Sequence, residues 1–373
     1  MGRKIKAAVM IKPGEIQLRE FPWPKLEEGS MLIKIDMSGI CGTDKHAYRG
    51  RKDYTFPLIP GHENVGVIVE ITEKAKKEME FSGEILKEGD RVVICPDILC
   101  GKCFFCRHSN GFTWCENIRS YGANLNIKEP PYITGGWSEY MYIFPGSFVY
   151  KVQKRMPLEM AVLTEPMAGT YSIDKLKDFT SFSSEGLIPG FSVVIQGLGP
   201  IGLIYIAKAK LLGASKVIAI GKYQNQLEMA KKFKADYLIN ISKISMKNII
   251  NFTKDITKGR GVELVINCTG IQSVMSDGLE MLRKGGIFLE ISAITNSETF
   301  PFSSYKVCIK SLRIIGMSNC AYIGFIPALE LMKQYSTYFP FEKIVTHKYP
   351  LEKIEEAINK SLESESLKVV VVP

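Results

Sequence analysis

Short runs of alternating hydrophobic and polar residues fill the first part of the chain. Residues Met31–Met37 alternate in the way that a half-buried strand does. Similar runs follow at Val65–Glu70 and Asp90–Ile94, and glycine or proline interrupts the chain between them. Short strands with this punctuation favour a small β-barrel or β-sandwich.

The pattern changes at Ile188. The continuous apolar run Ser192–Gln196 has the character of a fully buried strand, and a glycine-rich turn and a helical run at 203–212 follow it. Further apolar runs, separated by helical stretches, occur at Lys216–Ile220, Tyr237–Ile239, Leu264–Asn267, Gly286–Leu289 and Arg313–Gly316. Strands that alternate with helices predict a doubly wound parallel sheet, so the chain is of the α/β class.

The last part of the chain leaves this alternation. Two helical stretches, 326–335 and 352–361, precede the apolar run Leu367–Pro373. We expect this run to form a strand that rejoins the sheet of the first domain.

Composition narrows the class of protein. A chain of 373 residues is expected to form two domains, and 46% hydrophobic with 23% charged residues is ordinary for a globular protein. Since no apolar run is long enough to cross a membrane, we expect a cytoplasmic protein with no membrane partner. The net charge is +9, but the lysines are scattered, which indicates a solvated surface and no nucleic-acid partner.

Four of the nine cysteines stand in one short segment. Cys100, Cys103 and Cys106 are separated by two residues each, and Cys115 follows after eight more. Four thiolates can close a tetrahedral zinc site that has no open position. In a cytoplasmic protein such crowding indicates a metal site rather than disulfides. We therefore expect a structural zinc in a lobe at residues 95–118.

A second group of metal ligands precedes this lobe. Cys41 is followed by Thr43 and His46, and then by His62 and Glu63. A thiolate, an imidazole and a carboxylate suit zinc, so these residues predict a catalytic zinc site. Thr43 and His46 stand beside the first ligand, where a reacting hydroxyl needs a proton acceptor.

The glycine-rich turn has the pattern of a dinucleotide-binding site, and its members are Gly197, Leu198, Gly199, Pro200, Ile201 and Gly202. Between a buried strand and a helix, such glycines let the backbone approach a pyrophosphate. NAD-binding versions usually end the second strand with an acidic residue, but here Gly221 stands there, followed by Lys222 and Tyr223. Without a carboxylate to repel a 2′-phosphate, and with Lys222 to pair with it, NADP is predicted in preference to NAD.

Taken together, these motifs resemble the zinc-dependent medium-chain dehydrogenase/reductases, the family of alcohol, sorbitol and threonine dehydrogenases. The resemblance covers essentially the whole chain, with motifs in the family's order at Cys41–His46, Gly61–Glu63, the four cysteines, Glu165–Pro166 and Gly197–Gly202. It implies a GroES-like catalytic domain of residues 1–166 and 322–373. A Rossmann dinucleotide-binding domain of residues 167–321 would be inserted between these two segments.

The resemblance also implies which residues bind the metal. Cys41, His62 and either Glu63 or Glu165 would hold the catalytic zinc. With the zinc of the four-cysteine lobe, the chain would carry two zinc ions.

The expected reaction is hydride transfer between a secondary alcohol and NADP or NAD. Thr43 would accept the proton of the substrate hydroxyl and pass it toward His46. Glu165–Pro166 is similar to the polyol and threonine dehydrogenase branch, which favours a polyol, a sugar or a similar hydroxyl-rich substrate. Members of the family are commonly dimers or tetramers, so we expect a homodimer or homotetramer.

Two other interpretations are open. One is a zinc-free quinone or enoyl reductase of the same superfamily, which would lack the metal ligands that this chain has. The other is a non-catalytic nucleotide-binding protein of the same fold. Replacing Cys41 with serine distinguishes a zinc enzyme from both alternatives, because only a zinc enzyme loses turnover while it keeps its fold.

Overall fold

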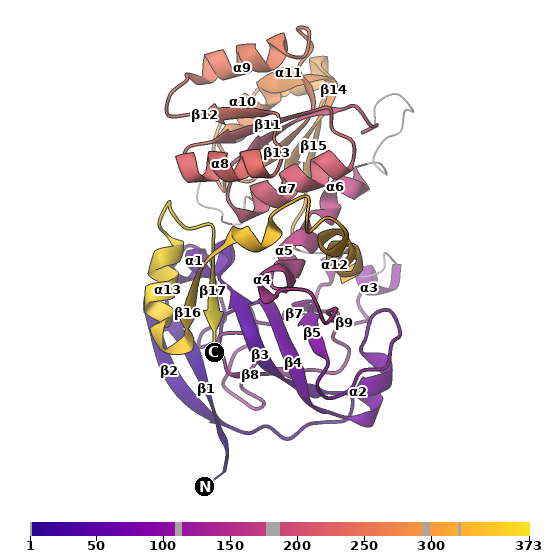
Figure 1. Cartoon of the computed structure of the whole chain (residues 1–373), viewed down its shortest axis with the longest axis vertical. Coiled ribbons are helices and arrows are strands. Elements are labelled where there is room, and N and C mark those ends of the chain that lie inside the picture. Colours follow the sequence, from indigo (N-terminus) through magenta and orange to yellow (C-terminus); the bar gives the residue numbers. More distant parts are fainter. Residues whose placement is uncertain (1, 109–113, 177–186, 293–294, 296–298, 320–321) are drawn as a thin grey trace. The chain divides into compact units, whose positions relative to one another are not determined.

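The computed structural model describes residues 2–108, 114–176, 187–292, 295, 299–319 and 322–373 (Figure 1). The chain divides into two compact units. The first contains Met1–Gly169, Cys320–Ser336 and Phe341–Pro373, and the second contains Thr170–Asn319 and Thr337–Pro340. Within the described residues, none of the helices combines the length and the apolar character needed to span a membrane.

Mostly antiparallel strands build the first unit, which confirms the β-rich first domain. The strands are β1 (Lys4–Lys12), β2 (Glu15–Pro22), β3 (Met31–Gly39), β4 (Glu63–Ile71), β5 (Arg91–Ile94), β6 (Asp97–Ile98), β7 (Arg119–Ser120), β8 (Tyr140–Ile143), β9 (Val149–Lys151), β16 (Val345–Pro350) and β17 (Lys368–Val372). A seven-stranded sheet has the order β16-β17-β3-β4-β5-β9, with β8 also paired to β3. Two further pairs, β1–β2 and β6–β7, lie outside this sheet.

Short helices complete this unit. They are α1 (Gly42–Tyr48), α2 (Glu73–Glu78), α3 (Phe104–His108), α4 (Leu158–Ala161), α5 (Thr164–Gly169), α12 (Phe325–Gln334) and α13 (Ile354–Ser361). Met31 and Ile33 of β3 pack into one core cluster, and Leu32 packs into another. From Ile33 to Met37 the buried residues alternate with exposed Lys34 and half-buried Asp36, which confirms the predicted half-buried strand.

The C-terminal strand returns to the first sheet, as predicted. Val370 pairs with Gly39, so β17 runs antiparallel to β3. Gly39 pairs on its other side with Glu63, the first residue of β4. This register brings Lys368, at the start of β17, close to Glu63.

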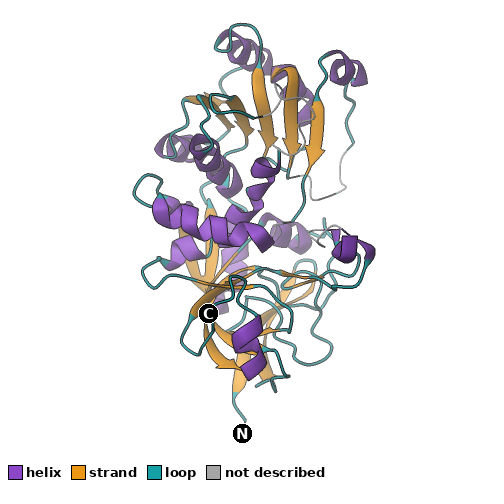
Figure 2. Ribbon diagram, turned by 90° about the vertical axis from the view of Figure 1, so that its right-hand side faces the viewer, coloured by secondary structure: helices purple, strands orange, loops and turns teal. Residues whose placement is uncertain are grey.

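The second unit contains the doubly wound parallel sheet. Its elements are α6 (Tyr171–Lys175), β10 (Ser192–Gln196), α7 (Pro200–Leu211), β11 (Lys216–Gly221), α8 (Gln224–Lys232), β12 (Tyr237–Asn240), α9 (Met246–Asp255), β13 (Val262–Asn267), α10 (Val274–Met281), β14 (Leu282–Glu290), α11 (Ser304–Ile309) and β15 (Arg313–Gly316). All six strands are parallel in the order β12-β11-β10-β13-β14-β15. Helices lie on both faces of the sheet (Figure 2), so the predicted fold class is confirmed.

Local interactions shape two short stretches of the first unit. Residues 158–169 form two short helices, α4 and α5, and the Thr164 hydroxyl at the start of α5 donates to the Ala161 carbonyl at 2.7 Å. Pro166 lies in the first turn of α5, where its missing N–H costs nothing. The segment between β4 and β5 contains α2, whose first turn is capped by Thr72.

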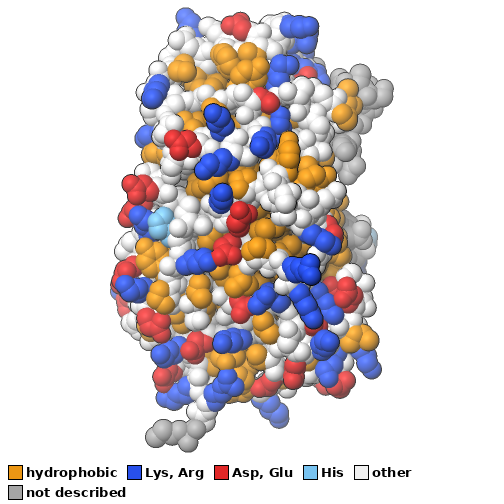
Figure 3. All heavy atoms as spheres, in the orientation of Figure 1, with side chains coloured by type: hydrophobic (Ala, Val, Ile, Leu, Met, Phe, Trp, Pro, Cys, Tyr) orange, Lys and Arg blue, Asp and Glu red, His pale blue; other side chains and the backbone are white. Residues whose placement is uncertain are grey.

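Charged side chains are distributed over both units. On the face in Figure 3, Lys and Arg side chains lie among Asp, Glu and hydrophobic ones. This distribution is that of a solvated surface.

Candidate active site

Cys41 stands at the start of α1. The Asp44 carboxylate accepts a hydrogen bond from the Cys41 backbone N–H at 2.8 Å, so the helix begins at this residue. The side chain of Asp44 is fully buried. The first helical turn therefore holds Cys41 in a fixed position.

Tight packing around Gly61, the residue before His62, positions this histidine. Gly61 has a φ of +93°, and a Cβ there would lie 2.6 Å from Trp137 Cδ1. A Cβ on Gly122 would lie 2.4 Å from the Gly61 carbonyl oxygen. Only glycine fits at either place, and Trp137, fully buried behind them, belongs to the core.

The residues of the predicted catalytic zinc site converge. Ligand atoms of Cys41, His62 and Glu63 all lie within 4.8 Å of one another. His62 Nδ1 lies 3.6 Å from Asp44 Oδ1, and His62 Nε2 lies 3.3 Å from Thr43 Oγ1. A carboxylate behind one imidazole nitrogen is typical of a metal-binding histidine, because it fixes the tautomer and the ring orientation.

The charge balance at this point also fits a cation. Burial lowers the pKa of His62, but the Asp44 and Cys41 charges outweigh it, so the pKa lies well above its usual range. Negative groups that draw a proton onto a buried imidazole attract a metal cation for the same reason. The residues present therefore fit zinc, with Asp44 as a partner that the sequence analysis did not single out.

Glu63 has a partner that the sequence analysis missed. Lys368 Nζ lies 2.6 and 2.7 Å from the two Glu63 carboxylate oxygens, and both side chains are at least 95% buried. Burial lowers the pKa of Lys368, but the Glu63 charge outweighs this effect and raises it. An ammonium group from β17 therefore stands against the Glu63 carboxylate.

Glu165, the alternative ligand, lies outside this compact group of three. It stands in the first turn of α5 and is half-buried. Its charge still raises the pKa of both His62 and Lys368, so it lies near them.

The two residues of the predicted proton relay share α1. Thr43 and His46 are three positions apart and are therefore neighbours on the helix surface. His46 is half-buried, and its Nδ1 has no hydrogen-bond partner within the described part of the chain. Burial and then the charge of Arg51 lower the pKa of His46, which favours the neutral imidazole that can accept a proton.

The four cysteines of the lobe also converge, with their sulfur atoms within 4.8 Å of one another. Backbone N–H groups point at these sulfurs: Cys103 N lies 3.4 Å from Cys100 Sγ, and Cys100 N lies 3.3 Å from Cys115 Sγ. The amides of Lys102 and Cys103 lower the pKa of the Cys100 thiol to about 6. Such N–H···S contacts stabilise thiolates, which is the form that binds metal.

In the second unit, the three glycines of the turn after β10 stand in different surroundings. A Cβ on Gly202 would lie 2.0 Å from the Gly197 carbonyl oxygen, so α7 could not pack so closely against the turn. Gly197 has a φ of +92°. Gly199 is the N-cap of α7, Pro200 and Ile201 open the helix, and a Cβ on Gly199 would meet nothing. Open space at the N-terminus of a helix of twelve residues fits a phosphate ligand.

The packing at the end of β11 accounts for the absence of an acidic side chain at Gly221. A Cβ on Gly221 would lie 2.6 Å from Leu198 Cδ1, so the Leu198 side chain takes part of the space that an acidic residue needs. Lys222 is exposed, and its ammonium group lies 5.7 Å from the centre of the Tyr223 ring.

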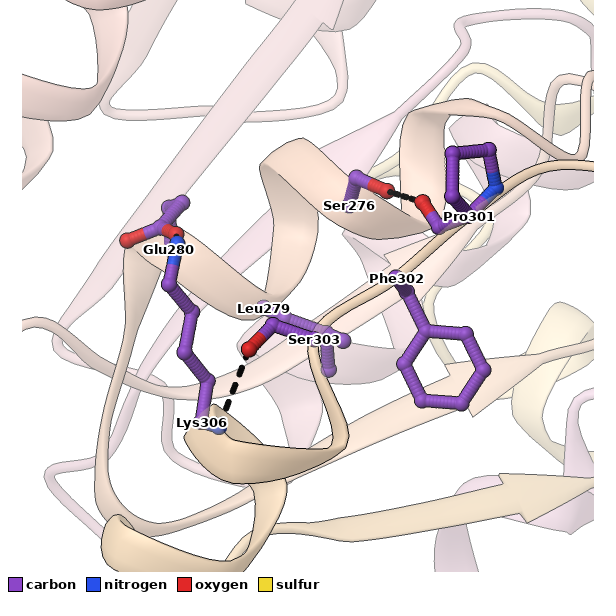
Figure 4. A pocket seen from close by; sticks show the side chains of 7 residues that line it. All are labelled: Ser276, Leu279, Glu280, Pro301, Phe302, Ser303 and Lys306. Carbon is purple, nitrogen blue, oxygen red and sulfur yellow. Dashed lines mark hydrogen bonds and ion pairs between the residues drawn. The ribbon is translucent and has the colours of Figure 1, made fainter.

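A surface cavity of about 410 Å³ lies elsewhere in the second unit (Figure 4). None of the predicted site residues lines it. Its lining residues are Ser276, Leu279, Glu280, Pro301, Phe302, Ser303 and Lys306.

Comparison with known proteins adds an independent line of evidence. Residues 27–154 match the family described as the alcohol dehydrogenase GroES-like domain, and residues 200–334 match the zinc-binding dehydrogenases. D-arabinitol dehydrogenase 1 of Uromyces fabae is 29% identical over 364 residues, 97% of this chain and 95% of that protein. L-threonine 3-dehydrogenase of Pyrococcus horikoshii is 31% identical over 376 residues, 99% of each chain. The crystal structure of an alcohol dehydrogenase from Thermotoga maritima has a TM-score of 0.92 and 30% identity, and the match covers both chains in full.

The chain therefore belongs to the zinc-dependent medium-chain dehydrogenase family, which confirms the resemblance drawn from its motifs. It is an oxidoreductase that acts on CH–OH donors and transfers hydride between an alcohol and NAD(P).

Proposed function

We propose that this chain oxidises a secondary alcohol of a polyol, sugar or similar hydroxyl-rich compound. The convergence of Cys41, His62 and Glu63 beside the Thr43 hydroxyl carries the proposal. The relative from Uromyces fabae, named for a polyol, supports the substrate class. Such an enzyme needs one metal to activate a hydroxyl and one dinucleotide to take the hydride.

Cys41, His62 and Glu63 hold the catalytic zinc in this proposal. A carboxylate has about four lone-pair positions, so Glu63 can accept from Lys368 and still bind a metal. Glu165, outside the compact group, is the alternative ligand. Zinc bound there acts as a Lewis acid that lowers the pKa of a substrate hydroxyl.

Thr43 accepts the proton of the substrate hydroxyl, and His46 passes it toward solvent. The lowered pKa of His46 supports this role, since a neutral imidazole is ready to accept a proton near neutral pH. The four cysteines of the lobe hold a second, structural zinc, because their sulfur atoms form a closed group of thiolates.

NADP is the preferred cofactor in this proposal, with its pyrophosphate at the turn Gly197–Gly202. Position 221 is a glycine, so it has no carboxylate that would repel a 2′-phosphate. The positive charge of Lys222, beside it, can pair with that phosphate. We expect kcat/KM for NADP to exceed that for NAD at least tenfold. Comparable values for both cofactors would contradict the assignment.

A homodimer is the proposed assembly. The side chains of Tyr305 and Ile309 on α11 are 70% and 59% exposed, and Phe302 and Ile314 beside them are 48% and 37% exposed. We call these four residues the edge surface. Ile314 belongs to β15, which pairs on one side only among the strands that the structure describes. An open strand beside exposed apolar groups is suited to pairing with a second copy about a twofold axis.

The domain division of the proposed enzyme is residues 1–166 with 322–373, and residues 167–321. The bounds of the two compact units support it. A cytoplasmic location stays a prediction from the sequence.

Initial rates across polyols, inositols, aldoses, threonine and simple alcohols test the function. Each compound is assayed with NADP and with NAD, with and without a zinc chelator. Chelator-sensitive turnover of a hydroxyl-rich compound supports the proposal. Turnover that survives chelation, and survives Cys41→Ser, would favour the zinc-free reductase, and silence in zinc-loaded, dinucleotide-binding protein would favour the non-catalytic protein.

A further inference from the structure

The ends of β10 and β13 meet where the connections of the parallel sheet diverge. These two strands are neighbours, but the chain passes from β10 through α7 to β11 on one side and from β13 through α10 to β14 on the other. Doubly wound sheets bind their ligands outside the carboxyl ends of the strands at such a point. The turn Gly197–Gly202 follows β10, and residues 268–271, which we call the β13 turn, follow β13.

The β13 turn packs directly against the first glycine of the dinucleotide turn. The Cys268 backbone N–H donates to the Gln196 carbonyl, the last one of β10, at 2.8 Å. A Cβ on Gly197 would lie 2.9 Å from both the Cys268 carbonyl oxygen and Thr269 Cγ2. A shift of the β13 turn would therefore displace the backbone that the pyrophosphate is expected to approach.

Asn267, the last residue of β13, fixes the shape of this turn. Its side chain is fully buried. The Asn267 amide oxygen accepts from the Thr269 backbone N–H at 3.0 Å and from the Thr269 hydroxyl at 2.7 Å. The amide nitrogen donates to the Ile271 carbonyl at 3.2 Å. One side chain therefore holds the turn from its middle to its end.

The same amide joins the turn to the next strand of the sheet. Asn267 Nδ2 also donates to Glu290 Oε2, at the end of β14, at 2.8 Å. The other oxygen of Glu290 accepts from the Ser292 backbone N–H at 2.9 Å and from its hydroxyl at 3.1 Å. An asparagine amide has two donor and two acceptor positions, and Asn267 uses all four. A buried polar network that is satisfied in this way holds a single arrangement.

We propose that Asn267 is a positioning residue for the dinucleotide, which holds the β13 turn against Gly197 and so sets the affinity of this chain for NADP or NAD. Because Asn267 is fully buried, it acts through the turn and not by touching the ligand. The inference rests on the proposed function, in which the pyrophosphate lies at the turn Gly197–Gly202.

Asn267→Asp tests the inference with almost no change in size. The variant keeps the oxygen that Thr269 contacts, but its second oxygen cannot donate to Glu290 or to the Ile271 carbonyl. Two carboxylates then face each other, and the turn loses its link to β14. We expect the Kd of NADPH, measured by its fluorescence on binding, to rise about tenfold. The Kd of NADH should rise by the same factor, because the 2′-phosphate is assigned to Lys222 and not to this turn.

A second substitution tests the link to β14 itself. When Glu290→Gln is added to Asn267→Asp, the new amide can donate to the new carboxylate and still accept from Ser292. The bond to the Ile271 carbonyl is not restored, so the recovery should be partial. We expect the double variant to bind NADPH about threefold more tightly than Asn267→Asp alone. A variant that is weakened only by general destabilisation would not recover in this way.

Thr257→Val is the matched control in the same unit. Thr257 is buried before the amino end of β13, opposite the β13 turn, and its hydroxyl donates to the Thr253 carbonyl at 2.7 Å. The same hydroxyl accepts from the Gly261 backbone N–H at 2.9 Å. Losing these buried bonds should lower the stability measured by urea denaturation. The Kd of NADPH should stay at its wild-type value.

A milder variant serves if Asn267→Asp does not fold. Thr269→Val removes the hydroxyl that contacts Asn267 and keeps a methyl group toward Gly197. We expect it to raise the Kd of NADPH about threefold, because Asn267 still holds the Ile271 carbonyl and Glu290.

These binding measurements need no turnover. They stand even if no alcohol is oxidised, an outcome that would count against the proposed substrate class alone. Wild-type affinity in Asn267→Asp, or in Thr269→Val where it replaces that variant, would overturn the inference. So would an equal loss of affinity in Thr257→Val, or a double variant that recovers none of the affinity.

Discussion

Lys368 places its ammonium group against both oxygens of Glu63, inside the protein and beside the candidate metal ligands. Two buried charges of opposite sign tolerate each other, but either one alone is costly in a medium of low polarity. The same ammonium group lies 3.4 Å from the carbonyl oxygen of Ile40, in the link between β3 and α1. Lys368 thus gives the buried Glu63 carboxylate an opposite charge beside the candidate metal group.

Removing Lys368 is expected to destabilise the metal-free protein strongly. Lys368→Met leaves the Glu63 charge buried and unpaired, at a cost of about 3–5 kcal/mol in the free energy of unfolding. Urea denaturation of the metal-free protein measures this change in the free energy of unfolding. Lys4→Met, which breaks the exposed pair with Glu20, is the control and should have a much smaller effect on the free energy of unfolding. If Lys368→Met lowered the free energy of unfolding no more than Lys4→Met, the buried pair would contribute little to stability.

A second prediction at this scale concerns pH. Positive groups around His46 lower its pKa, so replacing one of them should raise it. In the proposed relay, oxidation needs the neutral imidazole, and the acid limb of kcat/KM in Arg51→Gln should therefore move to higher pH. Arg155→Gln, another exposed arginine in the first unit, should leave the profile unchanged. A shift to lower pH in Arg51→Gln would exclude His46 as the group that titrates.

At the scale of elements, short helices, strand ends and turns carry the candidate site residues. The glycine at 61 lets the chain pass Trp137 before β4 begins, and the cysteine lobe follows β6. In this lobe α3 has only five residues and none of them is fully buried. A segment with so little apolar burial cannot hold itself together without another source of free energy.

Loss of one lobe ligand should therefore unfold the lobe but not the rest of the unit. We expect Cys115→Ser to lower the zinc content from about two ions per chain to about one and to open the lobe to proteolysis. Metal analysis and limited proteolysis measure the two effects. Cys308→Ser is the control, because Cys308 is exposed and lies outside both ligand groups. Retention of both ions in Cys115→Ser would remove Cys115 from the ligand set.

The local elements were predictable from the sequence, and the long-range contacts were not. The turn Gly197–Gly202 and the four cysteines carry their pattern within a few residues, so spacing alone identifies them. Lys368 meets Glu63 only through the pairing of β17 with β3, and no local pattern signals that register. The break between α4 and α5, beside which the Thr164 hydroxyl donates to the Ala161 carbonyl, has no proline or glycine to mark it in the sequence.

At the scale of the whole molecule, the edge surface predicts self-association. Ile309→Glu places a charge among exposed apolar groups and should convert the dimer to a monomer of 41.8 kDa. Light scattering after size exclusion measures the mass. Ile85→Glu is the control, since Ile85 is 68% exposed in the first unit. A wild-type protein that is already monomeric, or a dimer that survives Ile309→Glu, would contradict the prediction.

The second unit is built almost entirely from one continuous stretch, whereas the first unit joins segments that this stretch separates. Each parallel strand of the second unit pairs with strands close to it in sequence, but β17 must find β3 across more than three hundred residues. Closing so long a loop is slow, because its entropy is lost before the contacts form. We expect refolding in two phases, with the dinucleotide-binding sheet formed first and the pairing of β17 with β3 last. The Glu63–Lys368 pair, and with it the catalytic competence of the enzyme, would appear only in the slower phase.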